Sequence, residues 1–142
     1  MRDTIAQLTE VAGAQETVDA LHRAVEYDAT GAASPEQLEA VGAGWVAEEC
    51  LAIGVYCALY AARTGDIRGA LLLSVNHSGD SDSTGSVTGN LLGVTHGLSA
   101  LPKEWVSAVE GYATIVRVAD DLVANFFLHD RTPLGDRYRF ED

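Results

Sequence analysis

The stretch Asn76–Gly85 reads NHSGDSDSTG and places two carboxylates, Asp80 and Asp82, two positions apart. Hydroxyl side chains lie between and after them, at Ser81, Ser83 and Thr84. Hard divalent cations such as Mg²⁺ prefer a dense set of oxygen ligands of this kind. We therefore interpret the stretch as a candidate metal site.

The spacing of the two aspartates restricts the backbone that could present them to one ion. Positions i and i+2 are about 200° apart on an α-helix, so a helix interior would point the two carboxylates to opposite sides. Convergence requires a turn or a helix N-terminus. Because Gly79 precedes the pair and an apolar, glycine-spaced run follows it, we predict a loop that opens a helix. Such an end has free N–H groups that favour anionic ligands.

The rest of the chain also favours helices, and we predict an all-α fold. Ser34 followed by Pro35 and Gln37 is typical of a helix start with a capping box. Apolar periodicity and turn residues set the other boundaries. We predict helices over residues 14–27, 34–62, 67–75, 83–98 and 108–127, a break near residues 42–44, and a turn containing Trp105.

Four glycines recur at every fourth position of the helix expected after the Asp loop, at Gly85, Gly89, Gly93 and Gly97. Each glycine inside a helix costs about 1 kcal/mol relative to alanine. We expect a compensating close approach by another helix, with direct ligand approach at Gly85 alone.

The composition excludes several classes of partner. Among 142 residues, 9 Lys and Arg stand against 21 Asp and Glu, giving a net charge of −12. This charge repels nucleic-acid phosphates and anionic membranes and favours a bound cation. The longest apolar run, Leu51–Ala62, has 12 residues, fewer than the roughly 18 needed to span a membrane. No signal peptide is visible, so we expect a cytoplasmic protein.

The two cysteines, Cys50 and Cys57, lie seven positions apart on one predicted helix. Their Cα atoms would be about 10 Å apart at 1.5 Å per residue, which is too far for a disulfide. We expect two buried thiols.

Two known loop patterns partly match the stretch. The EF-hand pattern fits at Asp80, Asp82 and Gly85 but has Leu91 where its bidentate glutamate belongs. The D-x-D-x-T string of haloacid-dehalogenase phosphatases is spelled by Asp80, Asp82 and Thr84. In that family the first aspartate follows an apolar parallel strand, whereas residues 76–79 are polar. A phosphatase of this type remains the lesser alternative.

A third resemblance covers roughly residues 35–128. The matching blocks are GWVAEECLAIGVYCAL (Gly44–Leu59), ALLLSVNHSGDSDSTGSVTGNLLGVTHGL (Ala70–Leu98), and a Leu-Pro-x-x-Trp turn at 101–105 followed by Asp120-Asp121-Leu122. With these blocks the chain is similar to the C-terminal half of an ADP-ribosylglycohydrolase. That family includes the dinitrogenase-reductase-activating glycohydrolases and the ADP-ribosylarginine hydrolases.

This resemblance implies an all-helical hydrolase with a centre of two Mg²⁺ ions. Such an enzyme removes ADP-ribose from a protein side chain or a small conjugate by hydrolysing an N- or O-glycosidic bond. By position, Asp80, Asp82 and Ser83 would be metal ligands, and the two aspartates would also be catalytic. Nearby candidates for substrate contact are Asn76, His77, Gly79 and Gly85.

The family's other metal ligands come from a Thr/Ser-Asp-Asp motif in its N-terminal half, and this sequence lacks that motif. The acidic pair Glu48-Glu49 is preceded by alanine, and we expect one of the two glutamates to face solvent and the other to accept a hydrogen bond. We expect residues 1–128 to form a partial ADP-ribosylglycohydrolase domain, with a polar, flexible tail over 129–142.

Two states remain open for such a partial domain. It could be one piece of a split enzyme, completed by a separate N-terminal polypeptide. It could instead be a catalytically silent remnant that binds a partner. An incomplete domain should expose apolar surface, which we expect along residues 51–62, and should self-associate.

Overall fold

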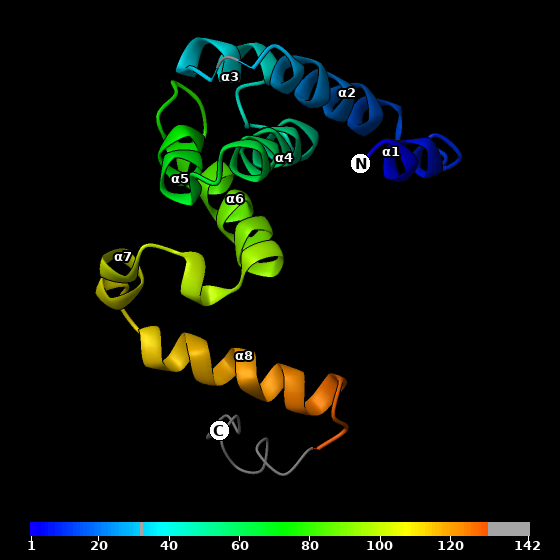
Figure 1. Ribbon diagram of the computed structural model, residues 1–142. Helices are drawn as coiled ribbons and strands as arrows, with labels where there is room; N and C mark the ends of the chain where they lie inside the picture. The colour runs from blue at the N-terminus through cyan, green and yellow to red at the C-terminus, as the bar shows by residue number, and fades with distance from the viewer. Residues whose placement is uncertain (32, 131–142) are drawn as a thin grey trace. The chain divides into compact units, whose positions relative to one another are not determined.

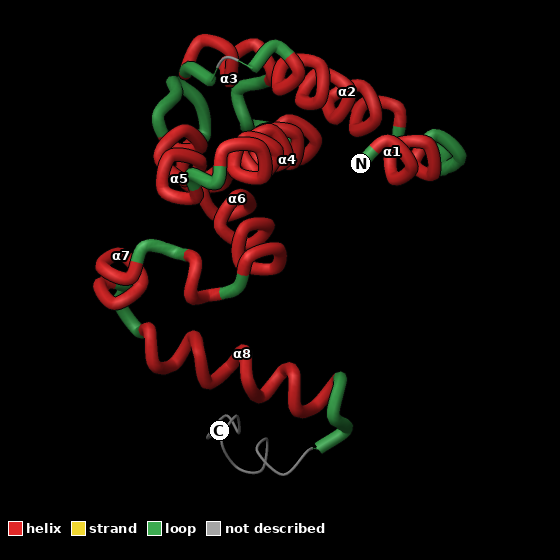
Figure 2. Tube along the Cα trace, in the orientation of Figure 1, coloured by secondary structure: helices red, strands yellow, loops and turns green. Residues whose placement is uncertain are grey.

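A computed structural model describes residues 1–31 and 33–130, and every regular element within them is a helix (Figures 1 and 2). The predicted all-α class is therefore confirmed for the described part of the chain. The chain divides into two compact units, Met1–Pro102 and Lys103–Asp142. The first unit contains α1 (Arg2–Leu8), α2 (Gln15–Ala29), α3 (Pro35–Val41), α4 (Ala47–Thr64), α5 (Ile67–Val75), α6 (Ser81–His96) and the short 3-10 helix η1 (Leu98–Ala100).

The core of the first unit is built around α4, which packs against α2, α3, α5 and α6. Ile53 and Tyr56 of α4 are fully buried, as are Leu38 of α3 and Leu92 of α6. Burial of each such side chain contributes about 1.5–3 kcal/mol. Helix α6 comes close to α4 at Gly54, where an added Cβ would lie 2.7 Å from Val87 Cγ1.

Local signals in the sequence set most helix ends. Ser34 Oγ accepts a hydrogen bond from the N–H of Gln37, and Pro35 occupies the first turn of α3, as predicted. The side chain of Gln37 does not complete a capping box, because its Oε1 accepts from the hydroxyl of Tyr56 at 3.2 Å while its Nε2 donates to Thr30 Oγ1. Gly65 ends α4 in the left-handed conformation, and Asp66 caps α5 by accepting from the N–H of Gly69 at 2.7 Å.

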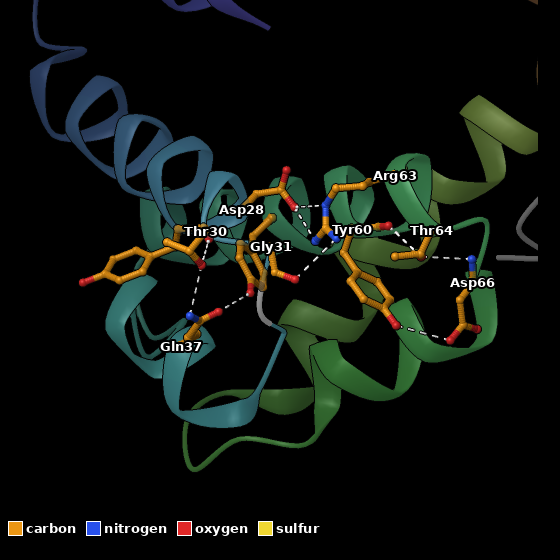
Figure 3. A network of polar contacts seen from close by, with 10 residues as sticks. Asp28, Thr30, Gly31, Gln37, Tyr60, Arg63, Thr64 and Asp66 are labelled. Atoms are coloured by element: carbon orange, nitrogen blue, oxygen red, sulfur yellow. Dashed lines mark hydrogen bonds and ion pairs between the residues drawn. The ribbon is translucent and has the colours of Figure 1, made fainter.

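A polar network joins the end of α2 to the end of α4 (Figure 3). Arg63 forms an ion pair with Asp28 at 3.1 Å, and its guanidinium lies 5.7 Å from the centroid of the Tyr60 ring. The hydroxyl of Tyr60 donates to Asp66 Oδ2 at 3.3 Å, which extends the network to the start of α5. Because Arg63 is partly exposed, the ion pair contributes at most about 1 kcal/mol.

The second unit contains α7 (Lys103–Ala108) and α8 (Tyr112–Phe126). Trp105 lies inside α7 rather than in a turn. Gly111 begins α8 with a φ of 73°, a conformation that favours glycine. Most of the expected tail, residues 131–142, lies outside the described residues.

The prediction of close approach at all four glycines of α6 is wrong at three of them. An added Cβ at Gly85 would meet Val75 Cγ1 at 2.7 Å, but no described atom lies within 4 Å of one at Gly89 or Gly93. Gly97 has a φ of 79° and ends the helix. The close contact between α4 and α6 is made at Gly54 of α4 instead. The prediction failed because the four-residue spacing does not show which face of α6 meets α4.

The expectation of an exposed apolar surface along residues 51–62 is also wrong. Helix α4 lies at the centre of the first unit, so its apolar residues form the core. Cys50 and Cys57 are free and buried, as predicted, and burial raises the pKa of the Cys57 thiol to about 12. None of the helices in the described ranges combines the length and apolar character needed to cross a membrane.

Candidate metal site

Asp80 is the residue at which the loop after α5 becomes α6. Its backbone is non-helical, and its Oδ1 accepts a hydrogen bond from the N–H of Ser83 at 3.4 Å. Helix α6 therefore starts at Ser81, two residues before the predicted start. Asp82 lies in the first turn. The loop-to-helix junction inferred from the i, i+2 spacing is thus present.

The junction places the three predicted ligand residues at the N-terminus of one helix, with Asp80 as its cap and Asp82 and Ser83 in its first turn. The pKa of Asp80 is lowered from its ordinary value, mainly by a hydrogen bond with the Asp82 side chain and next by the Ser83 side chain. The N–H of Ser83 acts in the same direction. We call Asp80, Asp82 and Ser83 the Asp80 cluster.

The loop before the cluster is held by three hydrogen bonds that its backbone N–H groups donate. The N–H of Ser78 donates to Glu39 Oε1 at 3.0 Å, and that of Gly79 donates to His77 Nδ1 at 3.0 Å. The N–H of Asp80 donates to the carbonyl of Ala43 at 2.9 Å. These bonds occupy the N–H groups of residues 78–80, which precede the first turn of α6. Figure 1 shows this loop reaching α3, the helix that carries Glu39.

Gly79 is required by packing against the backbone. A Cβ at this position would overlap the carbonyl oxygen of Ala43 and come within 2.7 Å of its carbon. The role found for Gly79 is therefore a close approach between two loops.

His77 and Thr84 stabilise the junction through hydrogen bonds on its buried side. Thr84 is fully buried, and its hydroxyl lies 2.7 Å from the carbonyl oxygen of Ser74 and 3.0 Å from His77 Nε2. Because His77 Nδ1 accepts from Gly79, the hydrogen of the neutral ring is assigned to Nε2, which faces Ser74 and Thr84. Both ring nitrogens of His77 therefore contact the protein.

Two other predicted residues contact different parts of the fold. Asn76 ends α5 and lines a shallow depression of ≈ 200 Å³ together with Tyr60 and Leu72. Gly85 accommodates the side chain of Val75 from α5. Neither is part of the Asp80 cluster.

Sequence reasoning missed the two glutamates that hold the loops around the cluster. Glu39 binds Ser78, as described above. Glu49 Oε2 accepts from the N–H groups of Ala43 and Gly44, at 3.0 and 3.2 Å. The sequence indicated that one member of the Glu48-Glu49 pair would accept a hydrogen bond, and only the fold identifies the donors.

The cluster offers two carboxylates and one hydroxyl, all hard oxygen donors that suit Mg²⁺. Across the described ranges, no group of three His, Cys, Asp or Glu side chains is placed to hold a metal ion. The set is therefore a partial one.

The backbone around the cluster differs from both alternative loop patterns. In a haloacid-dehalogenase phosphatase a strand would lead to Asp80, but the preceding element is the helix α5. An EF-hand needs a loop of twelve residues, but α6 is helical from Ser81 onward.

These features are those of a helical domain that presents a pair of aspartates at a helix N-terminus, and comparison with known proteins identifies the class. The ADP-ribosylglycohydrolase family matches over residues 1–132, and the chain belongs to this family. No solved structure matches the chain significantly.

Three curated relatives are similar to parts of the chain. ADP-ribosylhydrolase ARH3 of Danio rerio is 27% identical over 116 residues, which cover 75% of this chain and 30% of the relative. ADP-ribosylarginine hydrolase Tri1 of Pseudomonas putida (strain GB-1) is 36% identical over 67 residues, 47% of this chain and 16% of the relative. ADP-ribosyl-[dinitrogen reductase] glycohydrolase of Rhodospirillum rubrum is 36% identical over 47 residues, 33% of this chain and 16% of the relative. The matched regions thus span less than a third of each relative's length.

Proposed function

We propose that this chain supplies one half of the active site of a Mg²⁺-dependent ADP-ribosyl glycohydrolase. The observation that carries the proposal is the Asp80 cluster at the start of α6, in a chain of the ADP-ribosylglycohydrolase family. The substrate class would be an ADP-ribosylated protein or a small ADP-ribose conjugate. The names of the three relatives, an ADP-ribosylhydrolase, an ADP-ribosylarginine hydrolase and an ADP-ribosyl-[dinitrogen reductase] glycohydrolase, support this class.

In the proposed reaction, water adds to the anomeric carbon of the ribose while the bond to the acceptor breaks and the acceptor leaves with a proton. Bound Mg²⁺ would polarise the ribose hydroxyls and lower the pKa of a bound water. The chain's own contribution is the positioning of the ligands. Asp80 caps α6 and Asp82 lies in its first turn, and the hydrogen bond between His77 and Thr84 holds the place where this turn begins.

The remaining ligands of such a site would lie outside the Asp80 cluster, because the cluster offers only two carboxylates and one hydroxyl and no larger acidic group is placed to hold a metal among the described residues. The same partial set favours the second candidate function, a catalytically silent protein that binds a partner.

Calorimetric titration of ADP-ribose into the purified chain, with and without Mg²⁺, tests the proposal. We expect binding that requires Mg²⁺ and is lost in the double variant Asp80→Asn/Asp82→Asn. A folded chain that fails to bind ADP-ribose with Mg²⁺ present would favour the silent protein. Binding that persists in the double variant would place the ligand away from the Asp80 cluster.

A further inference from the structure

Glu49 lies on α4 and contacts the loop that leads into this helix. A single carboxylate oxygen, Oε2, accepts two consecutive N–H groups, those of Ala43 and Gly44. Hydrogen bonds to a charged acceptor are stronger than those between neutral groups. The Glu49 side chain therefore fixes the turn formed by residues 42–44.

The glycines of this turn allow it to fit between Glu49 and the Asp loop. An added Cβ at Gly42 would lie 2.8 Å from Glu49 Cβ. Gly44 is buried with a φ of 80°, and an added Cβ would lie 2.6 Å from Thr84 Cγ2. The turn therefore contacts Glu49 on one side and the first turn of α6 on the other.

The turn also holds the residue that caps α6. The carbonyl of Ala43 accepts from the N–H of Asp80 at 2.9 Å, next to the close approach of Gly79. One residue, Ala43, thus donates its N–H to Glu49 and accepts from Asp80. This gives a continuous path of hydrogen bonds from Glu49 to the backbone of the Asp80 cluster.

We propose that Glu49 is a positioning residue for the Asp80 cluster, acting through the turn of residues 42–44. This inference rests on the proposed Mg²⁺ site. Groups that orient the ligands of a metal are typically responsible for 10- to 100-fold in metal affinity. Loss of the Glu49 carboxylate would remove the hydrogen bonds that fix the turn. The backbone that positions Asp80 and Asp82 would then be less well fixed.

Mn²⁺ binding to the full chain tests the inference. It is measured as the decrease in the electron paramagnetic resonance signal of free Mn²⁺. Three substitutions are compared with the wild type. Glu49→Ala removes the acceptor, Glu49→Gln keeps an uncharged oxygen that can accept the same two N–H groups, and Asp82→Asn removes a proposed ligand. The matched control is Glu48→Ala, because Glu48 is the neighbouring glutamate and its side chain makes no hydrogen bond or ion pair within the described residues. Hydrogen exchange of the Asp80 amide provides a readout that does not depend on metal.

We expect Glu49→Ala to weaken Mn²⁺ binding about 10- to 100-fold and to accelerate exchange of the Asp80 amide. Glu49→Gln should restore most of the affinity and protection, and Glu48→Ala should match the wild type. If Glu49→Ala does not fold, Glu49→Asp takes its place, because a side chain one methylene shorter cannot span the same distance.

Several results would overturn the inference, and they separate it from the proposed function. Normal Mn²⁺ affinity or a normal exchange rate of the Asp80 amide in Glu49→Ala would refute the role of Glu49. If Asp82→Asn still weakens Mn²⁺ binding in that case, the proposed metal site is supported without Glu49. Equal loss in Glu49→Ala and Glu49→Gln would show that charge matters, as for a direct ligand. A wild-type chain that binds no Mn²⁺ would refute the metal site and the role of Glu49 together.

Discussion

Gly79→Ala should destabilise the first unit strongly, although it adds only one methyl group. The new Cβ would overlap the carbonyl oxygen of Ala43, and both groups belong to the backbone, so neither can rotate away. The two loops would have to separate, which breaks the 2.9 Å hydrogen bond between Asp80 and Ala43. Overpacking of this kind costs about 1–3 kcal/mol, and the lost bond costs about 1 kcal/mol more.

Urea unfolding followed by circular dichroism measures this effect. With a slope of about 2 kcal/mol per molar urea, a loss of about 2–4 kcal/mol lowers the midpoint by about 1–2 M. The matched control is Gly89→Ala, which adds the same methyl group to α6 where no described atom lies within 4 Å. Alanine has the higher helix propensity, so the control should stabilise the chain by about 0.5–1 kcal/mol.

We expect the two substitutions to change the free energy of unfolding in opposite directions. A Gly79→Ala chain as stable as the wild type would refute the close approach of the two loops. A destabilised Gly89→Ala chain would show that another surface packs on that face of α6.

Three further predictions concern the core and the cap of α6. Among the described residues, the buried Thr88 hydroxyl lies beside the weakly polar Cys57 thiol and makes no well-formed hydrogen bond. Thr88→Val should therefore raise the free energy of unfolding, measured in urea, by about 1 kcal/mol. A lower free energy of unfolding would show that the hydroxyl has a partner. Because burial raises the pKa of Cys57 to about 12, iodoacetamide at neutral pH should label Cys57 only as the chain unfolds. Labelling is detected by mass spectrometry, and rapid labelling of the native chain would contradict the burial of Cys57. The pKa of Asp80 is lowered by its bonds to Asp82 and Ser83, so its contribution to stability is present above the ordinary carboxyl range and is lost as the pH falls below about 4. The difference in unfolding free energy between wild type and Asp80→Asn should therefore shrink in acid, and a difference that grows on acidification would contradict the lowered pKa.

The sequence predicts those parts of the fold that depend on neighbouring residues. The bounds of α5 agree with the predicted 67–75, and the cap at Ser34 is where the Ser-Pro pattern indicated. The loop-to-helix junction at Asp80 and Asp82 also follows from local geometry, since a helix interior would point the two side chains to opposite sides.

The contacts that the sequence did not predict join residues far apart in the chain. Glu39 and Ser78 are 39 positions apart, and no periodic pattern links them. The four glycines of α6 predicted close packing, but their spacing carries no information about which face of the helix meets α4. Helix α1 was not predicted, because its polar sequence shows little apolar periodicity; Ile5 is its one buried side chain among those that the structure describes.

Thermal unfolding with and without Mg²⁺ tests the central claim, that the Asp80 cluster supplies ligands for this ion. A ligand that binds only the folded chain raises its stability, by about 1.4 kcal/mol at a concentration tenfold above Kd. We predict that Mg²⁺ raises the Tm of the wild-type chain and leaves that of Asp80→Asn/Asp82→Asn unchanged. An equal shift in both proteins, or a shift in neither, would contradict the assignment of these residues as Mg²⁺ ligands.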